Sequence, residues 1–299
     1  MKNQTKGVLY ALTTTLFWGF LAIALKVAVQ VIEPFTIVWF RFTMAFTFLL
    51  VFFIITDRKQ LRILTKPPLK LIFASLALGI NYIGFMLGVK YTSPSNAQVI
   101  IQIGPILLAI AGIVLFREKI RKRQIVGFAI VVIGFALFYS QQLKGMFLTH
   151  ANFNMGVLLT MMGAVAWTAY AILQKYLVRD YPPQTLNLFL FGLPALLYLP
   201  LANFENLGSL SIGWWGMLIF LGANTIIAYG GMSAALKYLD ANKVSTIIIN
   251  NPIITFLAMA AFSFFNVGWI EHEKFSPLVW LGAALFIGGA FVVIRSGKR

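Results

Sequence analysis

The sequence predicts an all-α integral membrane protein, with ten transmembrane helices arranged as two inverted five-helix repeats. Three observations lead to this prediction. The 299 residues are 60% hydrophobic and only 11% charged, ten apolar stretches have bilayer-spanning length, and the second half of the chain echoes the first. A soluble domain carries about 25% charged residues. The solvent for most of this chain must therefore be lipid.

The apolar stretches each cover roughly the 20 residues that a helix needs to cross a bilayer. They lie near 7–29, 35–55, 69–90, 94–116, 122–140, 155–178, 184–204, 212–236, 242–264 and 277–295. Helices are expected rather than a barrel, because barrel strands alternate and are about 10 residues long. The first stretch is expected to be retained, since it is too long for the core of a signal peptide and no A-x-A-like site follows it.

The positive charges indicate the topology. Of the 24 Lys and Arg residues, 19 fall on one side of the predicted spans, four on the other and one inside a span. The positive-inside rule then predicts that both termini are cytoplasmic in a multi-pass protein of the cytoplasmic (inner) membrane. The net charge of +16 is thus explained without a nucleic-acid partner. The chain has no cysteine, which excludes thiol and disulfide chemistry.

The repeat is clearest in two stretches, "KYTSPSNAQVIIQIGP" ending at Pro105 and "KYLDANKVSTIIINNP" ending at Pro252. Trp18 in "LFWGFLAIALK" likewise matches Trp167 in "AVAWTAYAILQK". We therefore predict one five-helix unit over residues 1–145 and a second over 146–299. Five spans is an odd number, so the second unit enters the membrane in the opposite sense. Inverted repeats of this kind are typical of secondary transporters.

The two prolines are predicted to break the fourth and ninth spans. Proline lacks a backbone donor, so the carbonyls of Ile101 and Ile248 lose their usual helical partners. Freed carbonyls are tolerated at membrane depth where they face protein or a water-lined cavity. Breaks at matching positions in two halves point to a binding site. The alternative is a pair of packing kinks, since proline is fairly common in membrane helices.

A family resemblance adds to this. The motif residues are the tryptophan in the first span of each unit, the central proline, and a glutamate before a glycine-rich last span, "GFAIVVIGFAL" or "GAALFIGGAF". The glutamates are Glu118 and Glu273, and a longer loop weakens the second match. With these motifs the sequence resembles an EamA-type member of the drug/metabolite transporter superfamily over nearly its whole length. The resemblance implies a ten-helix exporter or importer of small metabolites, often amino acids, with a central cavity.

Polar and aromatic residues inside the spans are the candidate substrate-binding groups, because a polar group at membrane depth is costly. Amides are expected to orient a solute and aromatic rings to contact it. The alternative for each amide is an interhelical hydrogen bond. The candidates are Trp18, Asn81, Tyr82, Gln98, Gln102, Trp167, Tyr170, Asn224, Tyr229, Asn250 and Asn251, with Pro105 and Pro252 at the helix breaks.

Arg41 is the one charge well inside a predicted span, about two turns into the second. One interpretation is a cation that holds a substrate carboxylate. The other is an arginine that snorkels to the outer interface or bonds to carbonyls there.

The predicted function is therefore a secondary transporter that moves a small metabolite, amino-acid-like or similar, by alternating access. All carboxylates and both histidines fall in loops or at span ends, which favours a facilitator or exchanger over proton coupling. No H-E-x-x-H or G-x-x-x-x-G-K-[ST] motif is present, so neither a metalloprotease nor an ATP-driven pump is expected. No metal, cofactor or nucleic acid is predicted.

Small-residue pairs such as Gly84-x-x-x-Gly88 favour packing within the bundle, and a monomer or weak homodimer is expected. The alternative function is a non-transporting membrane sensor or scaffold.

Overall fold

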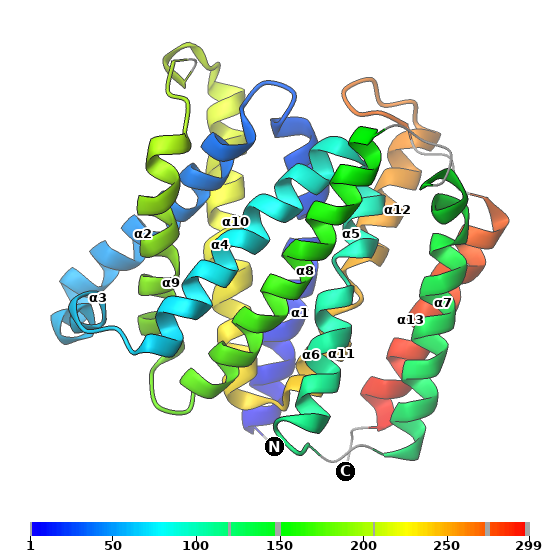
Figure 1. The fold of residues 1–299 in the computed structure, drawn as a ribbon, viewed down its shortest axis with the longest axis horizontal. Coiled ribbons are helices and arrows are strands. Elements are labelled where there is room, and N and C mark those ends of the chain that lie inside the picture. The colour runs from blue at the N-terminus through cyan, green and yellow to red at the C-terminus, as the bar shows by residue number, and fades with distance from the viewer. Residues whose placement is uncertain (1, 119–120, 147–150, 206, 273–275, 297–299) are drawn as a thin grey trace.

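A computed structural model describes residues 2–118, 121–146, 151–205, 207–272 and 276–296, and all regular secondary structure in these ranges is helical (Figure 1). The long helices are α1 (Lys2–Ala28), α2 (Pro34–Thr56), α4 (Leu69–Tyr91), α7 (Lys122–Met146), α8 (Ala151–Leu177), α9 (Pro183–Tyr198), α10 (Ile212–Tyr238) and α13 (Pro277–Ser296). Two segments are each divided into a pair of shorter helices: α5 (Pro94–Ile100) with α6 (Ile103–Val114), and α11 (Ala241–Ile248) with α12 (Asn251–Phe264). A short α3 (Arg62–Thr65) and three 3-10 turns, at Arg58–Leu61, Leu199–Leu201 and Leu207–Ser209, complete the described chain.

Eight helical segments among the described residues are long and apolar enough to cross a membrane. They are α1, α2, α4, the pair α5 and α6, α8, α9 with its following turn, α10, and the pair α11 and α12. Helices α7 and α13 coincide with the other two predicted spans but do not belong to these eight, so ten crossings remain a prediction. Glu273, matched to Glu118 in the sequence, lies outside the described residues.

Proline begins several of these helices. Pro34 opens α2, Pro94 opens α5, Pro183 opens α9 and Pro277 opens α13. The first helical position suits proline, because its fixed backbone angle is already helical and the missing N–H has no intrahelical partner there. Ser93 adds a side-chain cap to α5, since its Oγ accepts a hydrogen bond of 3.3 Å from the backbone N–H of Asn96. These local signals mark where the helices begin.

Helices from the two halves of the chain pack against each other in matching pairs. Helix α4 lies along α8, and α10 lies along α1. A Cβ on Gly84 would come within 2.6 Å of the Leu159 carbonyl oxygen on α8, and a Cβ on Gly231 within 2.7 Å of Thr14 Oγ1 on α1. Glycine at both positions therefore permits a close approach inside the bundle.

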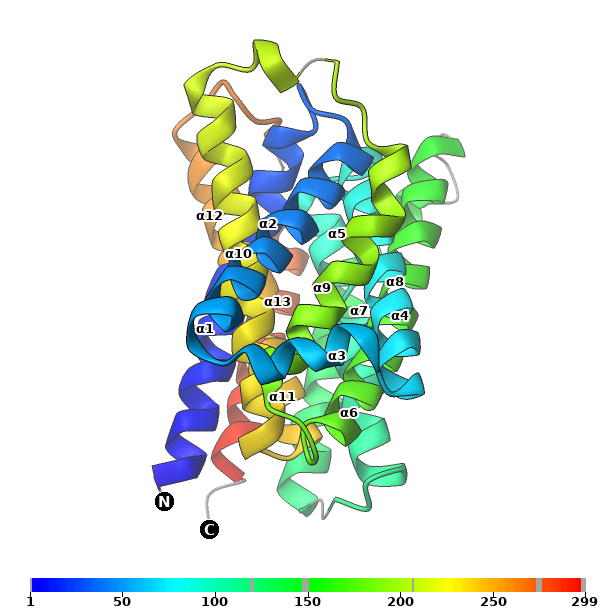
Figure 2. The same cartoon turned by 90° about the vertical axis from the view of Figure 1, so that its left-hand side faces the viewer.

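Helices α7 and α13 pack mainly against each other, at one edge of the bundle. A Cβ on Gly134 would lie 2.5 Å from the backbone nitrogen of Phe286, and one on Gly289 would lie 2.7 Å from that of Val131. This pair also joins the last helices of the two halves. Helix α1 begins and α13 ends at the same end of the bundle (Figures 1 and 2), which we call the terminal end.

Candidate functional site

Both proline-containing spans are broken near their middles. Helix α5 ends at Ile100 and α6 begins at Ile103, two residues before Pro105. Helix α11 ends at Ile248 and α12 begins at Asn251, one residue before Pro252. The proline thus lies in the first turn of the second helix in each case, where it lacks no bond that the helix would otherwise make. Just before its proline, each apolar span changes from i→i−4 to i→i−3 backbone hydrogen bonds, as from Gln102 to Val99 and from Asn250 to Ile247.

Nearby groups bond to backbone carbonyls at both breaks, and at the first break this corrects the expectation of a free carbonyl. The Ile101 carbonyl accepts a 3.0 Å hydrogen bond from the Gly104 N–H, so Pro105 does not leave it free. At the second break, Asn250 Nδ2 donates to the carbonyls of Thr246 and Ile247, at 2.8 and 3.1 Å. Asn250 therefore uses its amide to close its own break.

A cavity lies between the two breaks, with a volume of about 50 Å³. This volume is well below that of small-molecule sites, about 300–1,000 Å³, so the cavity is narrower in this conformation than a site that holds a solute. Its walls come from both halves of the chain, and they are mostly apolar and aromatic with a few amides. The lining residues are Trp18, Leu21, Asn81, Phe85, Gln98, Ile101, Gln102, Pro105, Trp167, Tyr229 and Asn251.

Three amide side chains join the two breaks across this cavity. Asn251 Oδ1 accepts hydrogen bonds from Gln98 Nε2 and from Gln102 Nε2, each 2.8 Å long. Gln98 Nε2 also donates to the Trp18 carbonyl at 3.1 Å, which connects the cluster to α1. We call Gln98, Gln102 and Asn251 the amide cluster. Gln102 Oε1 is buried without a hydrogen-bond partner, so the cluster keeps one free acceptor beside the cavity.

Aromatic rings form the opposite wall. Trp18 meets Trp167 edge to face with ring centroids 5.9 Å apart, and it meets Tyr229 at 5.1 Å. The Tyr229 hydroxyl donates to Asn81 Oδ1 at 3.1 Å, and Asn81 Nδ2 donates to the Gly163 carbonyl at 3.0 Å. The two tryptophans occupy matching places in the first helix of each half, and in the fold they meet at one point of the cavity.

Arg41 is buried, with 2% of its surface exposed. Its Nε donates to Thr225 Oγ1 at 3.1 Å, and its Cζ lies 4.4 Å from the ring centroid of Tyr82. The snorkelling interpretation is therefore wrong, because the side chain turns into the bundle rather than toward the interface. Arg41 does not itself line the cavity. Tyr82, its neighbour, packs 5.3 Å from Tyr229, which does.

The remaining predicted residues lie outside the cavity wall. Asn224 Nδ2 donates to the Phe17 carbonyl at 2.6 Å, as an interhelical bond would. Tyr170 is buried 5.9 Å from Tyr229. Pro252 lies in a separate apolar pocket against α7 and α13. The sequence reasoning missed Leu21, Phe85 and Ile101, because an apolar residue in an apolar helix carries no signal. Thr225 was also missed, although it lies one turn before Tyr229 on α10.

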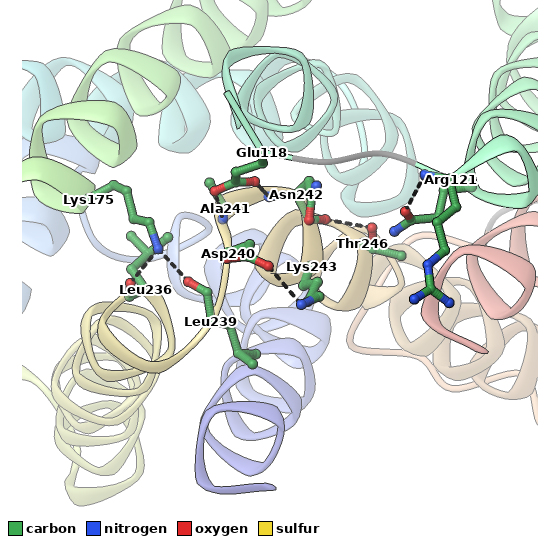
Figure 3. A network of polar contacts seen from close by, with 11 residues as sticks. Glu118, Arg121, Lys175, Leu236, Leu239, Asp240, Ala241, Asn242, Lys243 and Thr246 are labelled. Carbon is green, nitrogen blue, oxygen red and sulfur yellow. Dashed lines mark hydrogen bonds and ion pairs between the residues drawn. The ribbon is translucent and has the colours of Figure 1, made fainter. Parts of the chain in front are cut away.

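Glu118 and Lys175 connect four helix ends at the terminal end of the bundle (Figure 3). Glu118 accepts hydrogen bonds from the backbone N–H groups of Ala241 and Asn242, at 2.6 and 2.9 Å. A carboxylate is favoured here because these groups begin α11. Lys175 Nζ, at the end of α8, donates to the Leu236 carbonyl at 2.9 Å and also to that of Leu239, at the end of α10.

The chain fold allows Glu118 to reach this position. Arg117 has a positive φ of 52°, which turns the chain back after α6, and the Glu118 N–H donates to the Gly112 carbonyl at 3.0 Å. A Cβ on Gly112 would lie 2.6 Å from Glu118 Oε2. Glycine at 112 therefore leaves the space that the carboxylate fills.

A matching contact is found at the opposite end. Lys26, which corresponds to Lys175, donates to the Thr92 carbonyl at the end of α4, at 2.9 Å, and lies 3.7 Å from Glu271. Within the described residues, no group of three or more His, Cys, Asp or Glu side chains could hold a metal ion. The cavity wall thus offers amides and aromatic rings, and the buried guanidinium of Arg41 lies behind it, against Tyr82.

Comparisons with known proteins agree with this architecture. The EamA-like transporter family matches residues 5–140 and again 154–295. The chain is 32% identical to the "Uncharacterized inner membrane transporter YhbE" of Escherichia coli K12 over 97% of its length and 92% of the relative's. It is 30% identical to an "Uncharacterized transporter" of Haemophilus influenzae, over 98% and 96% of the two chains. A protein of known crystal structure shares the fold with a TM-score of 0.75, at 18% identity and 99% coverage of both chains.

Two family matches together span most of the chain, one over each predicted unit, and full-length relatives carry the name of transporter. The helical bundle, with enough apolar helices for a multi-pass membrane protein, supports a transporter rather than an enzyme. The chain belongs to the EamA-like transporter family.

Proposed function

We propose that this protein is a secondary transporter that carries a small metabolite, of amino-acid-like size, across the cytoplasmic (inner) membrane by alternating access. The observation that carries the proposal is the cavity between two broken helices, with walls from both halves of the chain. Broken helices at corresponding places in two repeats form the substrate sites of many transporters. The names of the relatives support an inner-membrane location.

The proposal includes ten spans, as two inverted five-helix repeats over 1–145 and 146–299, with both termini in the cytoplasm. Several contacts support this symmetry. Helix α4 packs on α8 as α10 packs on α1, and Lys26 and Lys175 hold the ends of α4 and α10 in the same manner. Inverted copies could exchange conformations, which would expose the cavity to each side in turn.

The contacts at the terminal end suggest how the exchange is controlled. Opening the cavity toward the cytoplasm would require α6 and α8 to separate from α10 and α11. The bonds from Glu118 to Ala241 and Asn242 would then break, while the contacts of Lys26 at the other end would hold. All acids fall at span ends or in loops, so we favour a facilitator or exchanger, with export set by the solute gradient.

The experiment is counterflow in proteoliposomes that contain the purified protein, preloaded with an unlabelled mixture of amino acids and small organic acids. Entry of labelled tracers faster than into protein-free liposomes is expected for at least one compound. The control is the Gln102→Leu variant, which removes the free acceptor of the amide cluster and should lower this entry. A sensor or scaffold would give the tracer entry of empty liposomes for every compound, and that result would refute the proposal.

A further inference from the structure

Arg41 places a positive charge inside the bundle. Among the described residues, it is the only charged residue that is buried, with 2% of its surface exposed. Arginine keeps its proton in proteins, so this charge cannot be removed by deprotonation. An unpaired charge in a low-dielectric interior is strongly unfavourable. The fold therefore needs something to compensate Arg41.

No carboxylate in the described part of the chain does so. The two ion pairs in the described part of the chain, Lys26–Glu271 and Lys243–Asp240, lie at the ends of the bundle. The partners of Arg41 are the Thr225 hydroxyl and Tyr82, which offers the face of its ring and its hydroxyl. Both are neutral groups, so they stabilise the charge but do not neutralise it.

Hydrogen-bond donors around Arg41 also lack well-aligned acceptors. The Nε1 of Trp18 is buried without a partner. The buried hydroxyls of Tyr82 and Tyr170 have no well-aligned hydrogen bond, although Thr225 and Tyr229 lie near the first and Ser233 near the second. All three rings surround Tyr229, with centroid distances of 5.3, 5.9 and 5.1 Å. Tyr229 lines the cavity. Trp18 also lines the cavity, whereas Arg41, Tyr82 and Tyr170 lie behind its wall. A guanidinium and three poorly satisfied donors are thus grouped around Tyr229, and buried groups of this kind are normally satisfied.

We propose that the cavity binds a small organic monoanion, with Arg41 as its counter-charge. The inference rests on the proposed transport function and names the substrate class. A carboxylate or a singly ionised phosphate ester would supply both the missing charge and several acceptors. One cation matches one anion: a neutral solute leaves Arg41 uncompensated, a dianion leaves an excess negative charge, and a zwitterion brings an ammonium for which the site has no carboxylate.

Arg41 acts across the pair Tyr82 and Tyr229 rather than from the cavity wall. Coulomb attraction falls only as the inverse of distance, and it is weakly screened where water is excluded. One intervening ring therefore does not abolish it. Arg41 is a positioning and specificity residue, whereas the amide cluster and the tryptophans contact the solute.

The test uses four probes of similar skeleton but different charge. They are 4-methylpentanoate, its neutral amide 4-methylpentanamide, the zwitterion leucine, and 3-methylbutyl phosphate at a pH that keeps it singly ionised or at one that makes it a dianion. Binding to the detergent-purified protein is measured by calorimetry and by the shift in its thermal unfolding temperature, which grows with ligand concentration over Kd. The variants are Arg41→Gln and Arg41→Lys. Arg58→Gln is the control, because Arg58 is exposed just after α2 and its Nε donates to the Ile54 carbonyl, far from the cavity lining.

The wild type and the Arg58→Gln control should bind the singly charged probes at least about tenfold more tightly than the amide, leucine or the dianion. Arg41→Lys should retain most of this preference and Arg41→Gln should lose it. Without ligand, Arg41→Gln should unfold at the same or a higher temperature than the wild type, because an uncompensated buried charge has been removed.

Three results would overturn the inference: equal binding of acid and amide, unchanged anion binding in Arg41→Gln, or binding of none of the probes. A fall in unfolding temperature in both Arg41 variants would assign a structural role and overturn it too. Counterflow separates this from the proposed function. Transport of the amide without binding of the acid would overturn the inference and support the transport function. Binding of the acid without any flux would support an anion site and refute the transport function.

Discussion

The two broken spans occupy corresponding places in the halves of the chain, but different groups complete them. At the first break the backbone closes itself, through the Gly104 N–H and the Ile101 carbonyl, and Gln98 and Gln102 are left to reach across the cavity. At the second, Asn250 caps its own carbonyls and Asn251 receives the two glutamines. The first half thus supplies donors and the second supplies the acceptor. Duplicated segments can keep a backbone feature while their side chains specialise.

The largest expected effect comes from the neighbours Asn250 and Asn251. Asn251→Ala removes the acceptor that both glutamines share, so it should abolish counterflow and destabilise the protein by about 1–3 kcal/mol. Asn250→Ala removes only a cap, so it should cost about 1 kcal/mol and leave most of the flux. Flux assays and thermal unfolding of the two variants decide this. Equal loss of flux in the two variants would show that Asn250 and Asn251 do not have different roles.

The next effect concerns the prolines. Pro105→Ala and Pro252→Ala each restore a backbone N–H in the first turn of a helix, where stability should change by less than about 1 kcal/mol. Flux should fall by about tenfold, since the bend between the paired helices is no longer enforced. If the halves are inverted copies, the two variants should bias access to opposite sides. Cysteine accessibility from each face provides the measurement, and wild-type flux in both would reduce the prolines to packing kinks.

A smaller difference is expected at the outer ends of the two breaks. Helix α11 is capped by the carboxylate of Glu118, whereas α5 is capped by the Ser93 hydroxyl. Glu118→Gln should therefore weaken the terminal end by about 1–2 kcal/mol and raise access to the cavity from the cytoplasm. Ser93→Ala should cost about 0.5–1 kcal/mol with little change in access. Thiol labelling at a cysteine introduced at Ile101 reports this, and equal access in both variants would contradict a gating role for Glu118.

The last prediction concerns the membrane topology, which thiol labelling tests with no expected change in flux. The native chain has no cysteine. Gly208 lies in open space beyond α9, and Lys59 is exposed after α2. Gly208→Cys should react with an impermeant thiol reagent from outside intact cells, and Lys59→Cys only after the membrane is opened. The reversed pattern would invert the topology, and with it the side that each break faces.

Much of this arrangement follows from patterns that sequence exposes well. Long apolar runs and clustered charges indicate membrane helices, and a proline within such a run indicates a break. The amides and tryptophans are predictable as candidates because polar groups in lipid are costly. Eight of the predicted residues line the cavity: Trp18, Asn81, Gln98, Gln102, Pro105, Trp167, Tyr229 and Asn251. Their role in substrate binding stays a prediction.

Side-chain direction was the part that sequence could not supply. Asn250 and Asn251 are adjacent, yet successive residues of a helix point about 100° apart, and only the three-dimensional packing decides which one meets the glutamines. The second span is apolar all round, so nothing marks the side on which Arg41 faces inward. Glu118 reaches α11 only because the chain reverses at Arg117, a local backbone choice that composition does not reveal.

The buried guanidinium of Arg41 also has an electrical consequence. A charge that crosses the whole membrane field gains or loses about 2.3 kcal/mol per 100 mV. Alternation between two conformations would carry Arg41 through part of that field, so the membrane potential, negative inside, would draw the unloaded carrier toward one of its two states. A bound anion would cancel the charge and make the loaded step insensitive to voltage. The energised membrane would then drive one half of the cycle and leave the other to the solute gradient.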